Sequence, residues 1–157
     1  MLQAPANLPA LTGDAAADAA ALLRALMLAG PRWELGATGP AAFDCWSMAR
    51  LIEAHLFARP LADVDARGPG LKGLAARGLR GARVWRERGG RELPAHGDGV
   101  LLTRPDERPH VGVFLALDRG LVAHMAEHQG FSADTLLALK TTGYRNPRFF
   151  EWRLVAD

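Results

Sequence analysis

The order of secondary-structure signals along the chain predicts an α+β fold. Two stretches with helical spacing of apolar residues lie in the first half, and short β-prone apolar runs follow in the second half. This order is typical of helices packed on a mostly antiparallel sheet. The length of 157 residues and the absence of internal repeats or a linker-like stretch favour a single domain spanning residues 1–157.

The first half contains the two predicted helices. Residues 1–12 are expected to form an irregular arm. A helix is expected to follow and to run to about Ala29, with Asp14 as its N-cap and Gly30-Pro31 ending it. The prolines and glycines of residues 31–40 predict a loop. The second helix is expected over Cys45–Phe57.

The second half contains the strand signals. We expect strands at Arg83–Arg88, Arg91–Leu93, Gly99–Thr103, His110–Leu117, Leu121–Met125 and Phe149–Val155. Gly89-Gly90 predicts a two-residue hairpin turn between the first two strands. Ser132–Lys140 predicts one or two helical turns, and residues 71–81 form either a short Arg-rich helix or a loop.

Composition and charge exclude several classes of protein. The net charge is only +2 and no Lys/Arg block is interleaved with aromatics, so nucleic-acid binding is not predicted. No stretch approaches the roughly 20 apolar residues of a membrane span, and no signal-peptide pattern opens the chain. We therefore expect synthesis in the cytoplasm. The single cysteine excludes an intramolecular disulfide and multi-cysteine zinc modules.

That cysteine, Cys45, falls at the predicted start of the second helix. Asp44 directly before it is a suitable N-cap, and an apolar stripe extends from Cys45 along one helical face. Unpaired backbone N–H groups and the helix dipole favour a thiolate at this position, which predicts a lowered thiol pKa. The pattern fits a nucleophile, and it equally fits a small buried hydrophobe.

Two histidines supply candidate partners for a nucleophilic thiol. His110 opens the strongest strand, and His124 lies near the end of the next one, so the two approach each other across a hairpin. One imidazole can then accept the thiol proton while the second orients the first. Alternatively, both are half-buried polar residues, or His124 joins His128 and Cys45 in a metal site.

The remaining histidines and the tryptophans near Cys45 have weaker signals. His55 on the helix face is expected to be a hydrogen-bonded core residue, and His96 lies in a loop. Trp33 and Trp46 flank the cysteine in sequence, where they either wall a binding groove or pack in the core.

The ordered motifs resemble the NlpC/P60 family of papain-like cell-wall cysteine peptidases. The matching stretches are GATGPAAFDCWSMARLIE (Gly36–Glu53), GDGVLL (Gly97–Leu102) and HVGVFLALDRGLVAH (His110–His124), followed by the closing strand. The resemblance covers about residues 30–155. The FDCW motif after a Gly-Pro loop is most similar to the branch found in phage tails and prophage clusters.

This resemblance implies a papain-like fold and a catalytic Cys45–His110–His124 triad, with Cys45 as nucleophile, His110 as base and His124 orienting the base. It implies hydrolysis of a peptide bond in peptidoglycan stems, between D-γ-glutamyl and a diamino acid, without a metal or organic cofactor. Trp33, Trp46 and Asp44 become candidate substrate contacts. The implied partners are the peptidoglycan peptide and phage tail proteins, with the protein delivered to the cell wall in the virion or by lysis.

Two other functions use the same scaffold. The glycine loop lacks the tyrosine often found in the family, and Ser47 replaces a common glycine. These departures suit a structural component of a phage tail tip. An acyltransferase or amidase would use the same three residues on another acyl donor.

Overall fold

The computed structural model describes residues 1–61, 85–105 and 109–153. The expectation for residues 71–81 and the ends of the strands expected at 83–88 and 149–155 lie outside these ranges. None of the helices in the described ranges is long and apolar enough to cross a membrane.

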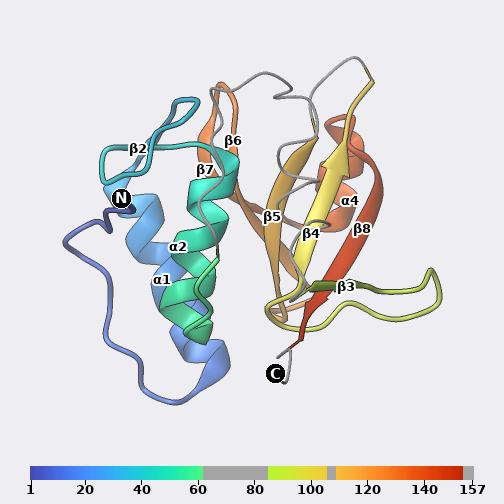
Figure 1. Ribbon diagram of the computed structural model, residues 1–157, viewed down its shortest axis with the longest axis horizontal. Coiled ribbons are helices and arrows are strands. Elements are labelled where there is room, and N and C mark those ends of the chain that lie inside the picture. The colour runs from blue at the N-terminus through green and yellow to red at the C-terminus, as the bar shows by residue number, and fades with distance from the viewer. Residues whose placement is uncertain (62–84, 106–108, 154–157) are drawn as a thin grey trace.

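The structure confirms the α+β class. A six-stranded antiparallel sheet has the strand order β3-β8-β4-β5-β6-β7. Its strands are β3 (Trp85–Glu87), β4 (Gly99–Thr103), β5 (His110–Leu115), β6 (Leu121–Ala126), β7 (Gly130–Asp134) and β8 (Arg145–Trp152). Helices α1 and α2 lie to one side of this sheet and α4 lies on the other (Figure 1).

The two predicted helices begin and end where their capping residues indicated. Helix α1 spans Ala15–Ala29, with the Asp14 carboxylate accepting from a backbone N–H of the first turn and Gly30 in the left-handed conformation at the end. Helix α2 spans Cys45–Phe57. The short helix α4 covers Leu136–Thr141.

The predicted loop over residues 31–40 contains one element that the sequence did not reveal. Strand β1 (Arg32–Trp33) pairs in parallel with β2 (Ala42–Phe43), immediately before α2. The N-terminal arm, which has no helix or strand, is tied to this loop by a hydrogen bond from the Gln3 N–H to the Thr38 carbonyl at 2.7 Å. The segment that leads to Cys45 is therefore bonded both to β1, through β2, and to the N-terminal arm, through Thr38.

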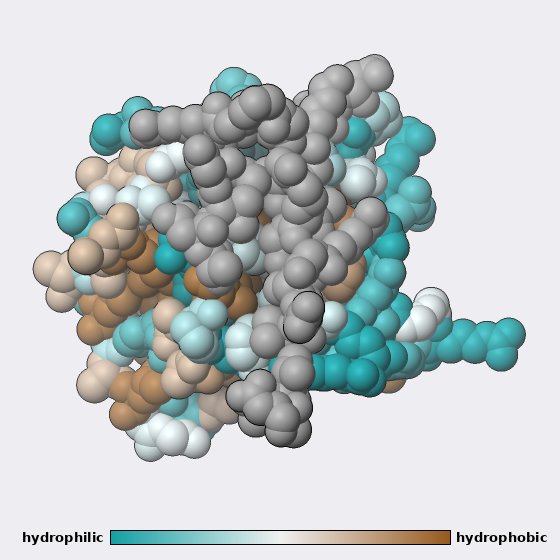
Figure 2. Space-filling model, viewed as in Figure 1, coloured by the Kyte–Doolittle hydropathy of each residue, from teal (hydrophilic) through white to brown (hydrophobic). Residues whose placement is uncertain are grey.

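The hairpin predicted at Gly89-Gly90 is wrong. Strand β3 pairs with β8, and residues 91–93 form no strand. The Glu92 carboxylate instead accepts from the Gly89 N–H at 3.1 Å and pairs with Arg86, so this segment closes as a polar loop. It projects from the molecule as a hydrophilic extension on the right of the view (Figure 2).

The helix predicted over Ser132–Lys140 is correct only in its second part. Residues 130–134 form β7, which pairs with β6 in the register His124 opposite Ser132. Thr135 then caps α4 through its side-chain oxygen. The final strand β8 also begins earlier than expected, at Arg145.

Alternation along β5 divides the core into two clusters. Val111 and Val113 belong to the larger cluster, which includes buried side chains of α1 and α2. Phe114 belongs to a smaller cluster that contains Leu139 of α4 and Tyr144. Because neighbouring side chains of a strand point to opposite faces, His110 lies on the α4 face of the sheet.

Strands β5 and β6 stop pairing at Gly112. Their register ends at the pair Val113–Ala123, although both strands continue beyond it. A Cβ added to Gly112 would lie 2.6 Å from Val122 Cγ1, 2.9 Å from the Ala123 carbonyl oxygen and 3.2 Å from His124 Cβ. Because Gly112 has no side chain, β6 can lie close to β5 at the point where the backbone pairing of the two strands ends.

We expect Gly112→Ala to destabilise the protein by about 1–3 kcal/mol, because the added methyl group must push β6 away. Chemical denaturation followed by circular dichroism measures the loss. Gly90→Ala is the matched control, since a Cβ there meets no described atom within 4 Å. Equal stability of the two variants would contradict the close approach at Gly112.

Candidate active site

Cys45 is the first residue of α2, and its position is fixed by a capping box. The Asp44 carboxylate accepts from the Ser47 N–H at 2.8 Å, and the Ser47 hydroxyl accepts from the Asp44 N–H at 3.0 Å. The second carboxylate oxygen accepts from the Gly36 N–H at 2.9 Å, and the Ser47 hydroxyl donates to the Ala37 carbonyl. The predicted cap is confirmed, and it joins the glycine loop to the helix start.

The thiol of Cys45 reaches the sheet at the beginning of β5. The backbone N–H of Val111, the residue after His110, lies close enough to the sulfur to lower the pKa of the thiol. Figure 1 shows the start of α2 and the start of β5 at the same end of the molecule. The nucleophile candidate and the base candidate thus come from segments that adjoin at one point.

The thiol is protonated in the resting site, contrary to the expectation from its helix position. Loss of solvent around the half-buried Cys45 raises its pKa to about 11, and the negative charge of Asp44 acts in the same direction. Hydrogen bonds from the backbone N–H groups of Val111, Trp46 and Cys45 itself lower the pKa, but by less. Desolvation therefore outweighs the helix terminus here.

His110 and His124 meet as predicted. The Nε2 atom of His110 lies 2.7 Å from Nδ1 of His124, and both residues are buried. The pair is diagonal rather than directly opposite, because the register of β5 and β6 leads from Val113–Ala123 toward Gly112 and His124. The contact depends on the missing side chain at Gly112.

Asp134 extends this pair, and the sequence analysis missed it. Its Oδ2 atom lies 2.7 Å from Nε2 of His124 and accepts from the Ser132 hydroxyl at 2.7 Å. Both residues lie on β7, which the sequence had assigned to the start of a helix. Alternation of Ser132 and Asp134 on one face of a strand next to His124 was the signal that could have identified them.

An aromatic ring and a cation cover His110. The Tyr144 ring stacks on the imidazole with centroids 5.4 Å apart, and the Arg104 guanidinium lies 4.0 Å from the centre of the Tyr144 ring. Burial, then the neighbouring His124 and Arg104, hold the pKa of His110 well below its ordinary value of 6.5. His110 is therefore neutral at rest and able to accept a proton.

The three predicted substrate contacts lie in different surroundings. Trp46 is 4% exposed and belongs to the main core cluster, while both carboxylate oxygens of Asp44 are occupied by the helix cap and the loop. Trp33 is half-buried on β1 and lines a hollow of about 410 Å³. The other residues around that hollow are Gly30, Pro31, Arg32, Glu127, His128, Gln129 and Gly130. Substrate binding by these three residues stays a prediction.

The hydrogen bonds of His124 argue against the alternative metal site. One ring nitrogen faces His110 and the other faces Asp134, so neither is left for a metal ion shared with His128 and Cys45. Within the described ranges, no group of three or more His, Cys, Asp or Glu side chains is arranged to hold a metal. Two further histidines bond to the backbone, His55 with the Pro9 carbonyl and His96 with the Ala116 N–H.

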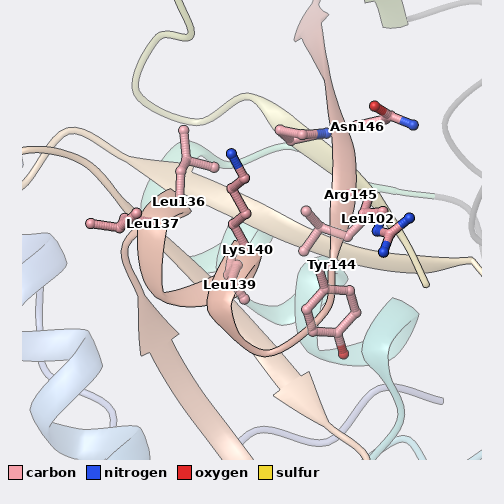
Figure 3. Close-up of a pocket in the computed structure, with 9 residues that line it drawn as sticks. Leu102, Leu136, Leu137, Leu139, Lys140, Tyr144, Arg145 and Asn146 are labelled. Carbon is pink, nitrogen blue, oxygen red and sulfur yellow. The ribbon is translucent and has the colours of Figure 1, made fainter. Parts of the chain in front are cut away.

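A larger hollow of about 810 Å³ lies between α4 and β8 (Figure 3). Leucines 102, 136, 137 and 139 form its apolar wall, and Lys140, Arg145 and Asn146 add polar groups. Tyr144, whose ring stacks on His110, also lines it. Tyr144 therefore contacts both the hollow and His110.

Comparison with known proteins gives no family assignment. No protein-family model matches the chain, and no curated protein matches it.

We expect alkylation of Cys45 by iodoacetamide to be slow at pH 7 and to accelerate up to about pH 11, because only the thiolate reacts and burial raises the thiol pKa to about 11. Mass spectrometry of the intact protein over a pH series measures the rate. A rate that reaches its plateau below pH 8 would show that the helix terminus, and not desolvation, controls the thiol.

We expect His110 to make the folded state less stable as the pH falls below about 6.5. The pKa of His110 is depressed in the folded protein, so the unfolded chain binds more protons in this range and is favoured on acidification. Urea denaturation of wild type and His110→Gln gives the free energy of unfolding at pH 7 and at pH 5, and we expect wild type to lose more of it on acidification. An equal loss in both proteins would contradict the lowered pKa of His110.

Proposed function

We propose that the protein is a cysteine peptidase of the NlpC/P60 type that cleaves a peptide bond in peptidoglycan stems. The observation that carries this proposal is the hydrogen-bonded series His110–His124–Asp134, which begins one residue from the Val111 amide that contacts the Cys45 thiol. A thiol, a neutral imidazole and an orienting group in this order are the parts required for nucleophilic acyl transfer.

The raised thiol pKa determines how such a reaction starts. A neutral thiol and a neutral imidazole are the resting pair, since the pKa of Cys45 is raised and that of His110 is lowered. The proton therefore moves from Sγ to His110 as the sulfur attacks the carbonyl carbon, and not beforehand. A substrate that excludes water and places its carbonyl by the helix start favours this transfer.

The remaining steps follow ordinary acyl-enzyme chemistry. The carbonyl oxygen becomes an oxyanion, which the Cys45 backbone N–H at the helix start stabilises. Collapse of this intermediate breaks the C–N bond, and His110 gives its proton to the departing amine. Water, deprotonated by His110, then attacks the thioester, and the thiol recovers its proton as the acid product leaves.

The family resemblance supplies the substrate class. It points to the bond between D-γ-glutamyl and a diamino acid, without a cofactor, in a protein delivered by a phage tail or by lysis. The weakly basic charge of +2 is compatible with an anionic cell-wall polymer.

Two observations favour a second candidate function, a structural component of a phage tail tip. A thiol with a pKa near 11 and a Trp46 buried in the core are both compatible with a peptidase scaffold that does not catalyse. An acyltransferase or amidase would require the same thiol and imidazole as the peptidase.

We expect the wild-type protein to release peptide fragments from purified peptidoglycan, and Cys45→Ala to release none, because the substitution removes the attacking sulfur. Mass spectrometry of the soluble fragments identifies the bond by its new amine and carboxyl ends. Circular dichroism confirms that both proteins are folded. Absence of fragments with folded wild type would favour the tail component, and fragments with both proteins would exclude Cys45 as nucleophile.

A further inference from the structure

We infer that Asp134 is a positioning residue that sets the proton position on His110 from two strands away, through His124. The inference rests on the proposed function for its catalytic meaning. The hydrogen-bond series from which it is drawn stands on the structure alone.

The chain of donors and acceptors has one consistent assignment when Asp134 is ionised and both imidazoles are neutral. A carboxylate only accepts hydrogen bonds, so Nε2 of His124 carries a proton and donates it to Asp134 at 2.7 Å. In a neutral imidazole the other nitrogen, Nδ1, then accepts. Its partner at 2.7 Å is Nε2 of His110, which must therefore carry the proton.

The proton on Nε2 of His110 leaves Nδ1 of the same ring as the basic nitrogen. Only this tautomer allows a neutral His110 to take a proton from a thiol at Nδ1 while it stays bonded to His124. With His124 neutral, the reverse assignment, in which His110 is protonated at Nδ1, would need His124 to donate from Nδ1 and accept at Nε2. It would then place a nitrogen lone pair against the Asp134 oxygen.

The surroundings keep Asp134 ionised. Its hydrogen bond with His124 lowers the pKa of the carboxyl, and the Ser132 hydroxyl, which donates to the same oxygen, lowers it further. The Asp134 side chain is 32% exposed, whereas that of His124 is 2% exposed. The charge is thus solvated at one side and bonded to a buried imidazole at the other.

A purely structural role for Asp134 makes a different prediction. If the carboxylate only satisfies the buried N–H of His124, its loss lowers stability but leaves the His110 proton where it was. If Asp134 sets the tautomer, its loss also redistributes the proton between the two nitrogens of His110. The proton position on His110 therefore separates the two roles.

The test is nitrogen-15 NMR of the imidazole rings, with Asp134→Asn and Asp134→Ala compared with wild type. We expect wild-type His110 to be protonated at Nε2 alone. In Asp134→Asn the amide offers both a donor and an acceptor, and in Asp134→Ala no side-chain acceptor remains, so we expect partial protonation at Nδ1 in each. If the alanine variant does not fold, the asparagine variant decides.

Asp118→Asn is the matched control. It removes the same charge from the turn between β5 and β6, at an exposed position with a φ of 52° that asparagine tolerates. We expect its His110 signals to match those of wild type. Protonation of wild-type His110 at Nδ1, or an unchanged His110 proton in both Asp134 variants, would overturn the inference.

Kinetics provide the second measurement. Loss of a comparable orienting carboxylate in a serine protease reduces kcat by about 10⁴ through the wrong tautomer. We expect Asp134→Asn to reduce kcat at least 10²-fold with little change in KM, and Asp134→Glu to restore part of the rate. An unchanged kcat would overturn the inference. If wild type does not cleave peptidoglycan, the proposed function fails, and the NMR result still decides the role of Asp134.

Discussion

The hydrogen bond between the buried imidazoles of His110 and His124 is the interaction on which the site depends. It has room to form because Gly112 lacks a side chain, which would collide with Val122 and with His124 itself. The residue before Gly112 is Val111, whose backbone N–H lies near the Cys45 sulfur and lowers the thiol pKa. The missing side chain of Gly112 thus leaves room for the two rings to meet, one residue from the Val111 amide near the thiol.

Burial is the second constraint, and it acts on both ends of the proposed proton transfer. Removing water raises the pKa of the Cys45 thiol and lowers that of the His110 imidazole, so neither group is charged at rest. The resting site therefore holds a neutral thiol and a neutral imidazole, and not a thiolate–imidazolium ion pair. The reaction then depends on substrate contacts that are stronger in the transition state than in the ground state.

Features with local causes could be read from the sequence. Asp14, Gly30 and Asp44 mark helix ends because a cap acts on residues within one turn, and the approach of His110 and His124 follows from one short hairpin. Asp134 could not be placed, because the pairing of β7 with β6 overrides the helical spacing of the leucines after it. The partner of β3 and the raised thiol pKa likewise depend on contacts between distant segments.

The histidine–aspartate series is built from three consecutive strands, with sequence separations of 14 and 10 residues across its two hydrogen bonds. Closing loops of such length costs little chain entropy, whereas the thiol comes from a helix far upstream in the chain. On the proposed function, the base is assembled by local contacts and the nucleophile joins it only when α2 docks on β5. On that proposal, a chain in which α2 is not docked on β5 has a base but no nucleophile beside it.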